Sequence, residues 1–215
     1  MMAYSSERLT PTERHREPVL YLLDDDTERL ASLRRVTQPL GIEPRAFVDP
    51  EKMLGACQRD EVGCVISHLQ LQSMDGLELQ LRMNEADLCL SLILTTTVAD
   101  VSLVVRAMRR GVKSVLMEPL EMNALVAEVR QGIHLSERAS QRQNETRNAK
   151  RRLSKLNSEE LAVLNLAMEG VPNREIAIRL AVSPRTVDRR RQSALQKLGA
   201  ESITEFAILK TLSGM

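Results

Sequence analysis

Short apolar runs alternate with amphipathic stretches over the first part of the chain. The apolar runs predict buried strands at residues 19–23, 45–48, 64–67, 90–95 and 114–117. The stretches between them place apolar residues at helical spacing, and they predict helices at residues 30–39, 51–58, 77–83 and 101–110 and another that starts at Met122. Such alternation favours a parallel sheet that helices cover on both faces. The pattern therefore predicts an α/β domain with a doubly wound, five-stranded parallel sheet.

Beyond Pro119 the pattern predicts helices only. The helix from Met122 continues into a stretch, residues 138–155, that holds seven basic residues and one acidic residue. Its few apolar positions indicate a solvated helical linker, with direct contact to a DNA backbone as the alternative. Four shorter helices are predicted to follow, at residues 158–169, 173–180, 184–198 and 203–212. The predicted organisation is a tail at 1–17, an α/β domain at 18–135, a helical linker at 136–155 and an all-α four-helix domain at 156–215.

The composition is that of a folded, globular protein. Of the 215 residues, 43% are hydrophobic and 27% are charged, which excludes collagen-like and wholly disordered chains. Residues 1–17 lack an apolar core, so we expect a disordered tail rather than a signal peptide or a membrane anchor. The longest mostly apolar stretch, residues 88–94, is far shorter than the ~20 residues of a spanning helix. Three cysteines without a CxxC pair fit a reducing compartment, and the expected location is the cytoplasm.

Charge is distributed unevenly between the two predicted domains. The net charge of the chain is only +1, but residues 1–135 carry 15 basic and 20 acidic side chains, whereas residues 136–215 carry 15 basic and 9 acidic ones. A basic second half indicates a polyanionic partner. Aromatic residues make up 2% of the chain, too few for the stacking platforms that bind single-stranded nucleic acid. Duplex DNA is therefore the expected partner.

Three consecutive aspartates, Asp24, Asp25 and Asp26, follow the first predicted strand. The carboxyl ends of parallel strands meet at the edge of the sheet where ligands bind. Clustered carboxylates at that edge are typical of a divalent-cation site. For Asp26 we favour a simpler role, as the cap of the helix that follows. Asp24 and Asp25 are the candidate cation ligands.

Three segments, LLDDDTERL, CVISHLQLQSMDGLEL and LILTTTVADVSLVVRAMRRGVKSVLMEPL, resemble the receiver domain of bacterial two-component response regulators. The resemblance implies a flavodoxin-like fold. In that family an acidic pair binds magnesium, an aspartate at the end of the third strand accepts a phosphoryl group, a Thr or Ser ends the fourth strand, and a lysine precedes a proline after the fifth. Asp24 and Asp25 match the acidic pair, Thr96 matches the hydroxyl position, and Pro119 matches the proline.

Two decisive positions of the family pattern are changed. His68 stands where the family has its phosphoacceptor aspartate, and Glu118 stands where it has the lysine. Val115 replaces the aromatic switch residue, and Gln72 replaces the proline of the turn after the acceptor. An imidazole does not reproduce the acyl phosphate chemistry of a carboxylate, and Glu118 would repel the phosphoryl dianion. We therefore expect no ordinary aspartyl phosphorylation.

These two changes exchange the charges of the two positions: the acidic position of the family holds a histidine, and the lysine position holds an acid. Our hypothesis is that His68 forms a salt bridge with Asp24, Asp25 or Glu118 that locks the domain in one state. The simplest interpretation is a hydrogen-bonded histidine in an inactive pocket; a transition-metal site and phosphorylation of the imidazole are further alternatives. We expect no cofactor, with magnesium at Asp24 and Asp25 as an open alternative. The resemblance also implies a cis peptide bond between Glu118 and Pro119.

The last predicted helices form a second motif. The helices at residues 173–180 and 184–198 are joined by the tight turn AVSP, with Ser183 as the helix cap and Pro184 at the first helical position. Residues 156–212 resemble the LuxR/FixJ-type helix-turn-helix domain over their whole length. The matching positions are Leu164, Gly170, Asn173, Glu175, Ile176, Ala177, Leu180, Val182, Ser183, Thr186, Val187, Lys197, Leu198 and Gly199. The second helix of the motif is the expected recognition helix in the DNA major groove.

By this resemblance the recognition helix carries the DNA contacts. Asp188, Arg189 and Gln192 take the positions that face base edges. The positions expected to approach phosphates are Asn173, Arg174, Arg185, Thr186 and Arg191. The last helix has an apolar stripe with Ile203, Phe206 and Leu209, which the resemblance assigns to dimerisation, with core packing as the alternative for Phe206. A two-fold dimer implies an inverted-repeat DNA site.

The favoured function is a DNA-binding transcription regulator of the response-regulator type. It would work without aspartyl phosphorylation, and its receiver would serve as a dimerisation or docking module. One alternative is a receiver that senses another input, such as pH through His68 or a small ligand in the altered pocket. Another is a protein-interaction decoy that titrates a kinase or a partner regulator. An enzyme is not expected, because no nucleophile–base constellation is left.

Overall fold

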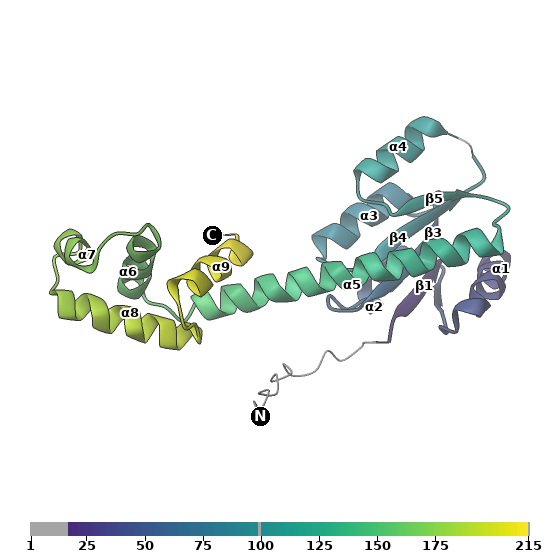
Figure 1. The fold of residues 1–215 in the computed structure, drawn as a ribbon. Helices are drawn as coiled ribbons and strands as arrows, with labels where there is room; N and C mark the ends of the chain where they lie inside the picture. Colours follow the sequence, from purple (N-terminus) through teal and green to yellow (C-terminus); the bar gives the residue numbers. More distant parts are fainter. Residues whose placement is uncertain (1–16, 99, 215) are drawn as a thin grey trace, which may run out of the picture. The chain divides into compact units, whose positions relative to one another are not determined.

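The structure is a computed structural model that describes residues 17–98 and 100–214. The chain divides after Ser140 into two compact units, and each unit has its own hydrophobic core. Figure 1 shows the helices and strands of both units. The predicted tail at residues 1–17 lies, except for Glu17, outside the described residues.

The first unit contains a five-stranded sheet in which all neighbouring strands run parallel. Its strands are β1 (Val19–Leu23), β2 (Arg45–Phe47), β3 (Gly63–His68), β4 (Ser91–Thr96) and β5 (Ser114–Met117). Their order across the sheet is β2-β1-β3-β4-β5. The strands lie where the apolar runs predicted them, so the predicted α/β fold with a doubly wound sheet is confirmed.

Helices cover both faces of this sheet (Figure 1). One face carries α1 (Thr27–Thr37) and the first part of α5 (Met122–Leu153), and the other carries α2 (Pro50–Ala56), α3 (Gly76–Glu85) and α4 (Val101–Arg109). A short 3-10 helix, η1 (Gln38–Leu40), follows α1. Successive side chains of a strand point to opposite faces. In β1, Leu20 and Leu22 therefore pack toward α1 and α5, whereas Tyr21 and Leu23 pack toward the opposite helices.

Four strands end at the same edge of the sheet. His68, the last residue of β3, is paired with Thr95 of β4, and Thr96 is paired with Met117 of β5. The carboxyl end of β1 lies beside that of β3, where Leu23 is paired with Ser67. The loops that leave these strand ends bring residues far apart in the sequence to one place.

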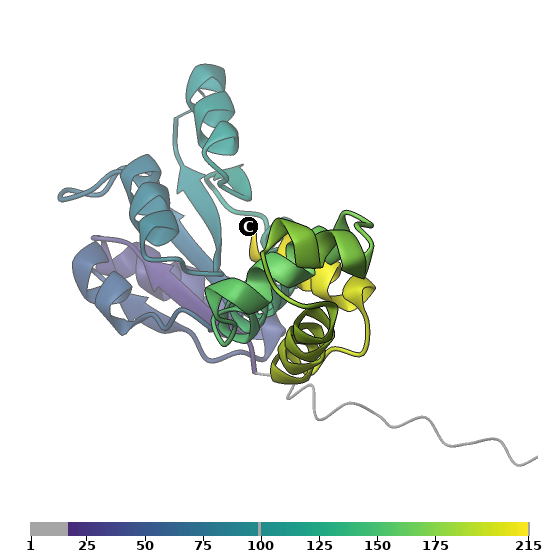
Figure 2. The same ribbon diagram turned by 90° about the vertical axis from the view of Figure 1, so that its left-hand side faces the viewer.

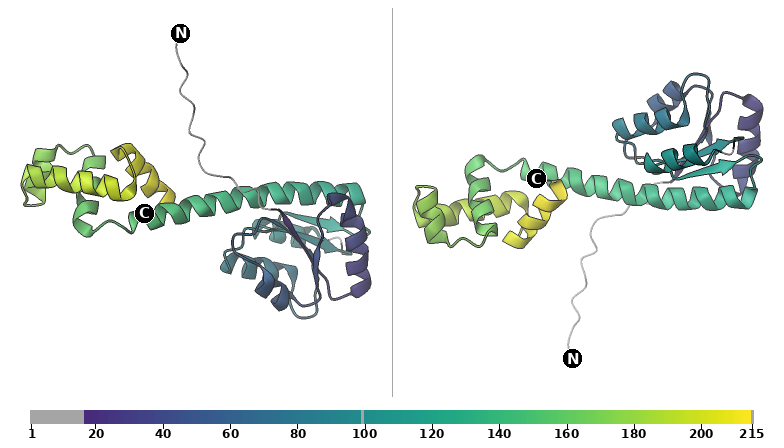
Figure 3. Two further views of the ribbon diagram at one scale, coloured as in Figure 1. Left: turned by 90° about the horizontal axis from the view of Figure 1, so that it is seen from below. Right: turned by 90° about the horizontal axis from the view of Figure 1, so that it is seen from above.

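Helix α5 is a single helix of 32 residues (Figure 3). In the first unit the Ser136 hydroxyl accepts a hydrogen bond from the Gly63 amide at 2.9 Å. In the second unit Ala149 and Leu153 belong to the hydrophobic core. The predicted linker stretch therefore contributes packing to both units. Despite its length, neither α5 nor any other helix of the part that the structure describes is long and apolar enough to cross a membrane.

The second unit contains the four predicted short helices (Figure 2). They are α6 (Ser158–Met168), α7 (Asn173–Arg179), α8 (Pro184–Leu198) and α9 (Ile203–Ser213). Asn157 and Glu160 form a capping box at the start of α6, and Ser183 caps α8 as predicted. The helical prediction for this half is thus confirmed.

Two of the three apolar residues predicted to form a dimer contact on α9 face inward. Phe206 is fully buried and Leu209 nearly so, and both belong to the core of the second unit with Ile203 packed against them. Side chains that the unit itself buries have no surface left for a partner. The exposed apolar residues of α9 are Ile208, at 54% exposure, and Leu212, at 38%. Core packing, the alternative given for Phe206, is therefore confirmed for Phe206 and Leu209, whereas a dimer contact through the rest of α9 stays a prediction.

Candidate functional site

The structure brings the predicted receiver residues to one edge of the sheet. Asp24 and Asp25 follow β1, His68 ends β3, Thr96 ends β4, and Glu118 follows β5. Parallel pairing of the four strands places these ends side by side. The five residues come from four separate segments, as the matched family pattern implied.

His68 is paired with Glu118. The imidazole Nδ1 lies 3.2 Å from Glu118 Oε1, and it also lies 3.5 Å from the Thr95 hydroxyl. The pair is largely removed from water, with His68 6% exposed and the Glu118 side chain 19% exposed. Of the three acids that the sequence offered as partners of His68, the structure selects Glu118. The peptide bond between Glu118 and Pro119 is cis, as the resemblance implied.

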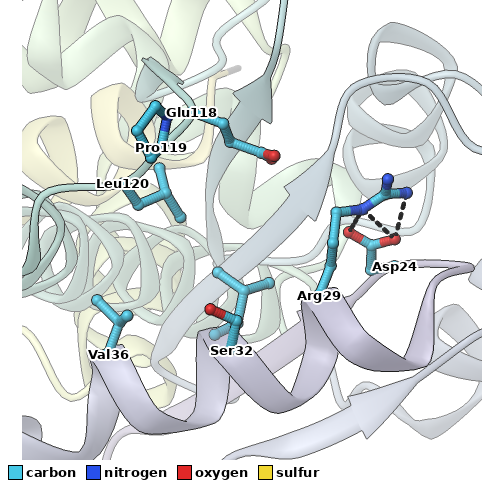
Figure 4. A pocket seen from close by; sticks show the side chains of 8 residues that line it. Asp24, Arg29, Ser32, Val36, Glu118, Pro119 and Leu120 are labelled. Carbon is cyan, nitrogen blue, oxygen red and sulfur yellow. Dashed lines mark hydrogen bonds and ion pairs between the residues drawn. The ribbon is translucent and has the colours of Figure 1, made fainter.

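Asp24 and Asp25 are paired with Arg29, on the first turn of α1, and Figure 4 shows the contact with Asp24. Arg29 Nε donates to both Asp24 carboxylate oxygens, at 3.1 and 2.9 Å, and Nη2 donates to Asp24 Oδ1 at 2.8 Å. The same Nη2 donates to Asp25 Oδ1 at 3.2 Å. The hydrogen bond to Asp24 raises the pKa of Arg29 above its ordinary value. A guanidinium therefore supplies the positive charge that the acidic pair requires.

Sequence analysis missed Arg29, although its spacing carried a signal. It lies four residues after Asp25 and three after Asp26, so a side chain on the first turn of the helix can reach back to the residues that precede the helix. Asp26 is the helix cap, as predicted: its carboxylate accepts from the Glu28 and Arg29 amides. Those two backbone hydrogen bonds are the main cause that lowers the pKa of Asp26.

The remaining polar groups of the pocket also have partners within the chain. The Gln72 amide donates to Asp25 Oδ2 at 2.9 Å, and the Val98 amide donates to the Thr96 hydroxyl at 3.1 Å. The fold implies a divalent cation here, but the residues do not fit one. Arg29 faces the carboxylate oxygens, and the described residues contain no group of three or more His, Cys, Asp or Glu side chains that could hold a metal.

A pocket of about 280 Å³ adjoins these ion pairs (Figure 4). One part of its wall is charged or polar and comes from Asp24, Arg29, Ser32 and Glu118. The rest is apolar, and its residues are Leu33, Val36, Pro119 and Leu120. The altered receiver site thus opens onto a small, partly apolar cavity rather than onto a purely acidic crevice.

The predicted DNA-contact residues lie on α7 and α8. Val187, Ala194 and Leu198 hold α8 on the core of its unit. The exposed candidates are Arg174, Arg185, Asp188, Arg189 and Gln192, and those that are partly buried are Asn173, Thr186 and Arg191. Thr186 is hydrogen-bonded to Ser183, and the Asn173 amide donates to the Asp188 carboxylate. One face of α8 is therefore buried, and the other presents the predicted side chains to solvent.

A buried carboxylate attaches α8 to α6, and sequence analysis missed it. Glu160 is 4% exposed, and its carboxylate accepts from Ser193 at 2.8 Å and from Lys197 at 2.9 Å, both on α8. Burial works to raise the pKa of Glu160, but its hydrogen bonds outweigh burial and lower that pKa. Arg190, which is also on α8, forms an ion pair with Glu159 of α6. Lys197 and Arg190 therefore hold the recognition helix in place.

Comparison with known families defines the class. Residues 20–130, more than half of the chain, match the response regulator receiver domain, and residues 154–210 match the bacterial regulatory proteins of the LuxR family. The chain belongs to the response regulators, and it is a DNA-binding transcription factor of the LuxR type.

Individual relatives share this two-part organisation. The chain is 29% identical over 196 residues to the transcriptional regulatory protein FixJ of Bradyrhizobium diazoefficiens, covering 91% of this chain and 96% of FixJ. It is 26% identical over 193 residues to the response regulator TodT of Pseudomonas putida, covering 89% and 84%. Among solved structures it is similar to the response regulator StyR, with a TM-score of 0.78, 26% identity and coverage of 91% and 99%. Full-length FixJ from B. japonicum gives a TM-score of 0.54 at 28% identity, with coverage of 93% and 98%.

Proposed function

We propose that this response regulator binds DNA and controls transcription without aspartyl phosphorylation. The observation that carries the proposal is the pair formed by His68 and Glu118, 3.2 Å apart, at the positions of the phosphoacceptor and of the lysine. The pair replaces both groups that would form and hold an acyl phosphate. The receiver is then a fixed dimerisation or docking module rather than a phosphorylation switch.

Phosphoryl transfer to a receiver requires three groups at this edge of the sheet. They are a carboxylate nucleophile, a divalent cation and an ammonium group that draws in the phosphoryl oxygens. His68 offers an imidazole that is already bound to Glu118, and the Glu118 carboxylate carries the wrong charge for a phosphoryl group. Arg29 occupies the carboxylate oxygens that a cation would need. All three requirements therefore fail together.

The exposed face of α8 is the proposed DNA-binding surface. Arg189 can bind guanine, Gln192 can bind adenine, and Asp188 can accept from cytosine in the major groove. Contacts to phosphates are assigned to Asn173, Arg174, Arg185, Thr186 and Arg191. Support comes from the exposure of these side chains at one face of the helix-turn-helix unit.

We propose that the receiver forms a homodimer, which fits an inverted-repeat DNA site. Helix α4 carries an apolar row that its own unit leaves uncovered: Val101 is 79% exposed, Val105 44% and Met108 50%. Their spacing of four and three residues puts them on one face of the helix. Exposed apolar patches of this kind mark protein interaction sites.

The test is DNA binding by the untreated full-length protein. A duplex selected from a random library should bind without any phosphodonor, with an affinity that falls steeply as salt rises. Arg174→Ala, a phosphate contact, should weaken binding to all duplexes alike, whereas Glu169→Ala, on the exposed end of α6, should not. Binding that appears only after phosphodonor treatment would overturn the proposal, and no duplex binding under any condition would favour a protein-interaction decoy.

A second candidate function, a ligand-sensing receiver, is favoured by the pocket of about 280 Å³ beside Arg29. That volume is close to the lower limit of about 300 Å³ for small-molecule sites. Val36→Trp should fill the pocket without touching the ion pairs. A ligand from a metabolite library that raises the melting temperature of the wild type, and has no effect on Val36→Trp, would support this function. If no compound shifts the wild type, the pocket is not a sensor.

A further inference from the structure

We propose that Arg29 is a built-in cation that takes the place of a divalent metal ion and closes the acidic site of this receiver to metals. The inference deepens the proposed function and rests on it, because a receiver that accepts no phosphoryl group has no use for magnesium. Its corollary is that removal of the guanidinium opens a divalent-cation site at Asp24 and Asp25.

The carboxylate of Asp24 is buried, and burial of its charge is costly. The Asp24 side chain is 1% exposed. An ionised carboxylate at such a position is strongly unfavourable unless a cation and hydrogen bonds compensate it. The Asp26 amide donates one hydrogen bond to Asp24 Oδ1 at 2.9 Å, which is not enough for a full negative charge. A cation must therefore sit here, and Arg29 is the one that the chain supplies.

The guanidinium of Arg29 faces the carboxylates of all three aspartates. It donates twice to Asp24 Oδ1 and once to Asp24 Oδ2, at 2.8 to 3.1 Å. It donates to Asp25 at 3.2 Å, and its Nη1 lies 3.7 Å from an Asp26 oxygen. One planar group thus contacts three consecutive carboxylates. This arrangement shares a single positive charge among them, as a metal ion would.

The guanidinium of Arg29 and a divalent metal ion exclude each other from this site. Magnesium binds oxygen ligands at about 2.0–2.1 Å in near-octahedral geometry. Both oxygens of Asp24 already accept N–H groups of Arg29, and Asp25 Oδ2 accepts the Gln72 amide. An ion could approach these atoms only after Arg29 had left. Because the guanidinium stays charged at every physiological pH and is tethered to α1, it competes at any concentration of free metal.

The acidic site of this receiver therefore keeps one conformation, with or without a metal ion in solution. The charged groups of the pocket form two separate sets of contacts, Arg29 with the aspartates and His68 with Glu118. Neither set depends on an external ion. The loop after β1 and the start of α1 are therefore held in the same state whether magnesium is present or not.

Binding of Mn²⁺ to the full-length protein tests the inference. It is measured by calorimetry and by the loss of the electron paramagnetic resonance signal of free Mn²⁺. The wild type should show no saturable site that depends on Asp24. Arg29→Gln should gain one saturable site, because removal of one charge-assisted competitor is expected to raise the affinity for the ion about tenfold to a hundredfold. That site should vanish in Arg29→Gln/Asp24→Asn.

Arg34→Gln is the matched control. Arg34 lies on the same helix and pairs with an exposed glutamate, Glu43, at 3.4 Å. Its removal changes the net charge as Arg29→Gln does but touches no ligand of the acidic site, so it should leave manganese binding as in the wild type. A gain of the site in Arg34→Gln would show that net charge, not the Arg29 contact, excludes the metal, and would overturn the inference.

Two results contradict the inference directly. One is a wild-type manganese site that Asp24→Asn abolishes, a result that does not depend on whether Arg29→Gln folds. The other is a folded Arg29→Gln protein, checked by circular dichroism, that gains no site. Phosphodonor dependence of DNA binding is measured on the same wild-type sample. A phosphodonor response without metal binding to the wild type would refute the proposed function and leave the role of Arg29 intact.

Discussion

The receiver pocket and the recognition helix α8 are both rich in charged side chains, yet they use them in opposite ways. In the pocket, Arg29 pairs with Asp24, and His68 pairs with Glu118. On α8, Arg185 and Arg189 are exposed, and within residues 17–98 and 100–214 neither forms an ion pair. Charges that neutralise one another inside a domain fix a conformation, whereas exposed and unpaired charges are available to a polyanion. We propose that the exposed charges of α8 form the output surface of this chain and that the paired charges of the pocket close its input site.

The largest effect is expected from the core that supports α8. Phe206→Ala should lower the free energy of unfolding by about 3–5 kcal/mol, because it leaves a cavity in the core of the second unit. DNA binding should be lost with it. Ile208→Ala, at the exposed position two residues further on, should change stability by less than about 0.5 kcal/mol. Urea unfolding followed by circular dichroism measures both; equal effects would show that Phe206 does not support the core of the second unit.

Substitution of the buried Glu160 tests whether a buried charge holds α8 in place, as buried charges hold the receiver pocket. Glu160→Gln should cost about 1.5–3 kcal/mol, because two hydrogen bonds from Lys197 and Ser193 lose their charged acceptor. The pKa of Glu160 is below its ordinary value of 4.5. Its stabilisation is therefore complete above the unfolded pKa and is lost as the pH falls through the lower, folded pKa.

Unfolding measured between neutral and acidic pH separates this contribution from others. The wild type should lose stability in the acidic range more steeply than Glu160→Gln does. Glu169→Gln, at the exposed position directly after the same helix, should follow the wild type. If Glu160→Gln retains the full acid sensitivity, Glu160 does not anchor the helix.

Arg189 and Arg174 test the output surface. Arg189→Ala should cost about 1–3 kcal/mol of discrimination between the preferred duplex and one with a changed base pair. Arg174→Ala should weaken both duplexes equally and make the dependence of affinity on salt less steep. Fluorescence anisotropy with the two duplexes at several salt concentrations gives both quantities. An Arg189→Ala protein with unchanged preference would remove α8 from base recognition.

The smallest effect is expected in the receiver pocket. Glu118→Gln should lower the free energy of unfolding by about 1 kcal/mol, because the amide keeps one hydrogen bond to His68 but loses the charge. DNA affinity should not change, since the pocket holds a conformation and gives no signal. The melting temperature and a DNA titration check the two statements. A changed DNA affinity would mean that the pocket still communicates with the DNA-binding half.

Sequence analysis found the fold and most of the site because both depend on local pattern. The runs at β1, β3 and β4 are continuous and apolar, which is typical of strands buried on both faces. His68 and Glu118 could be placed opposite each other because the ends of parallel strands meet. The Arg29 contact was missed because the acidic pair was interpreted through the ion that its family binds. The burial of Leu209 was not predicted, and that of Phe206 was only an alternative, because an apolar stripe does not disclose which of its residues the domain itself covers.

The most direct test is a DNA titration of the full-length protein with magnesium and beryllofluoride, which mimics a phosphorylated receiver. The same DNA affinity and the same oligomeric state are expected with and without beryllofluoride, because the pairs of His68 with Glu118 and of Arg29 with Asp24 leave no site for it. A magnesium-dependent gain in DNA affinity or a change in oligomeric state would contradict the claim that the receiver is closed.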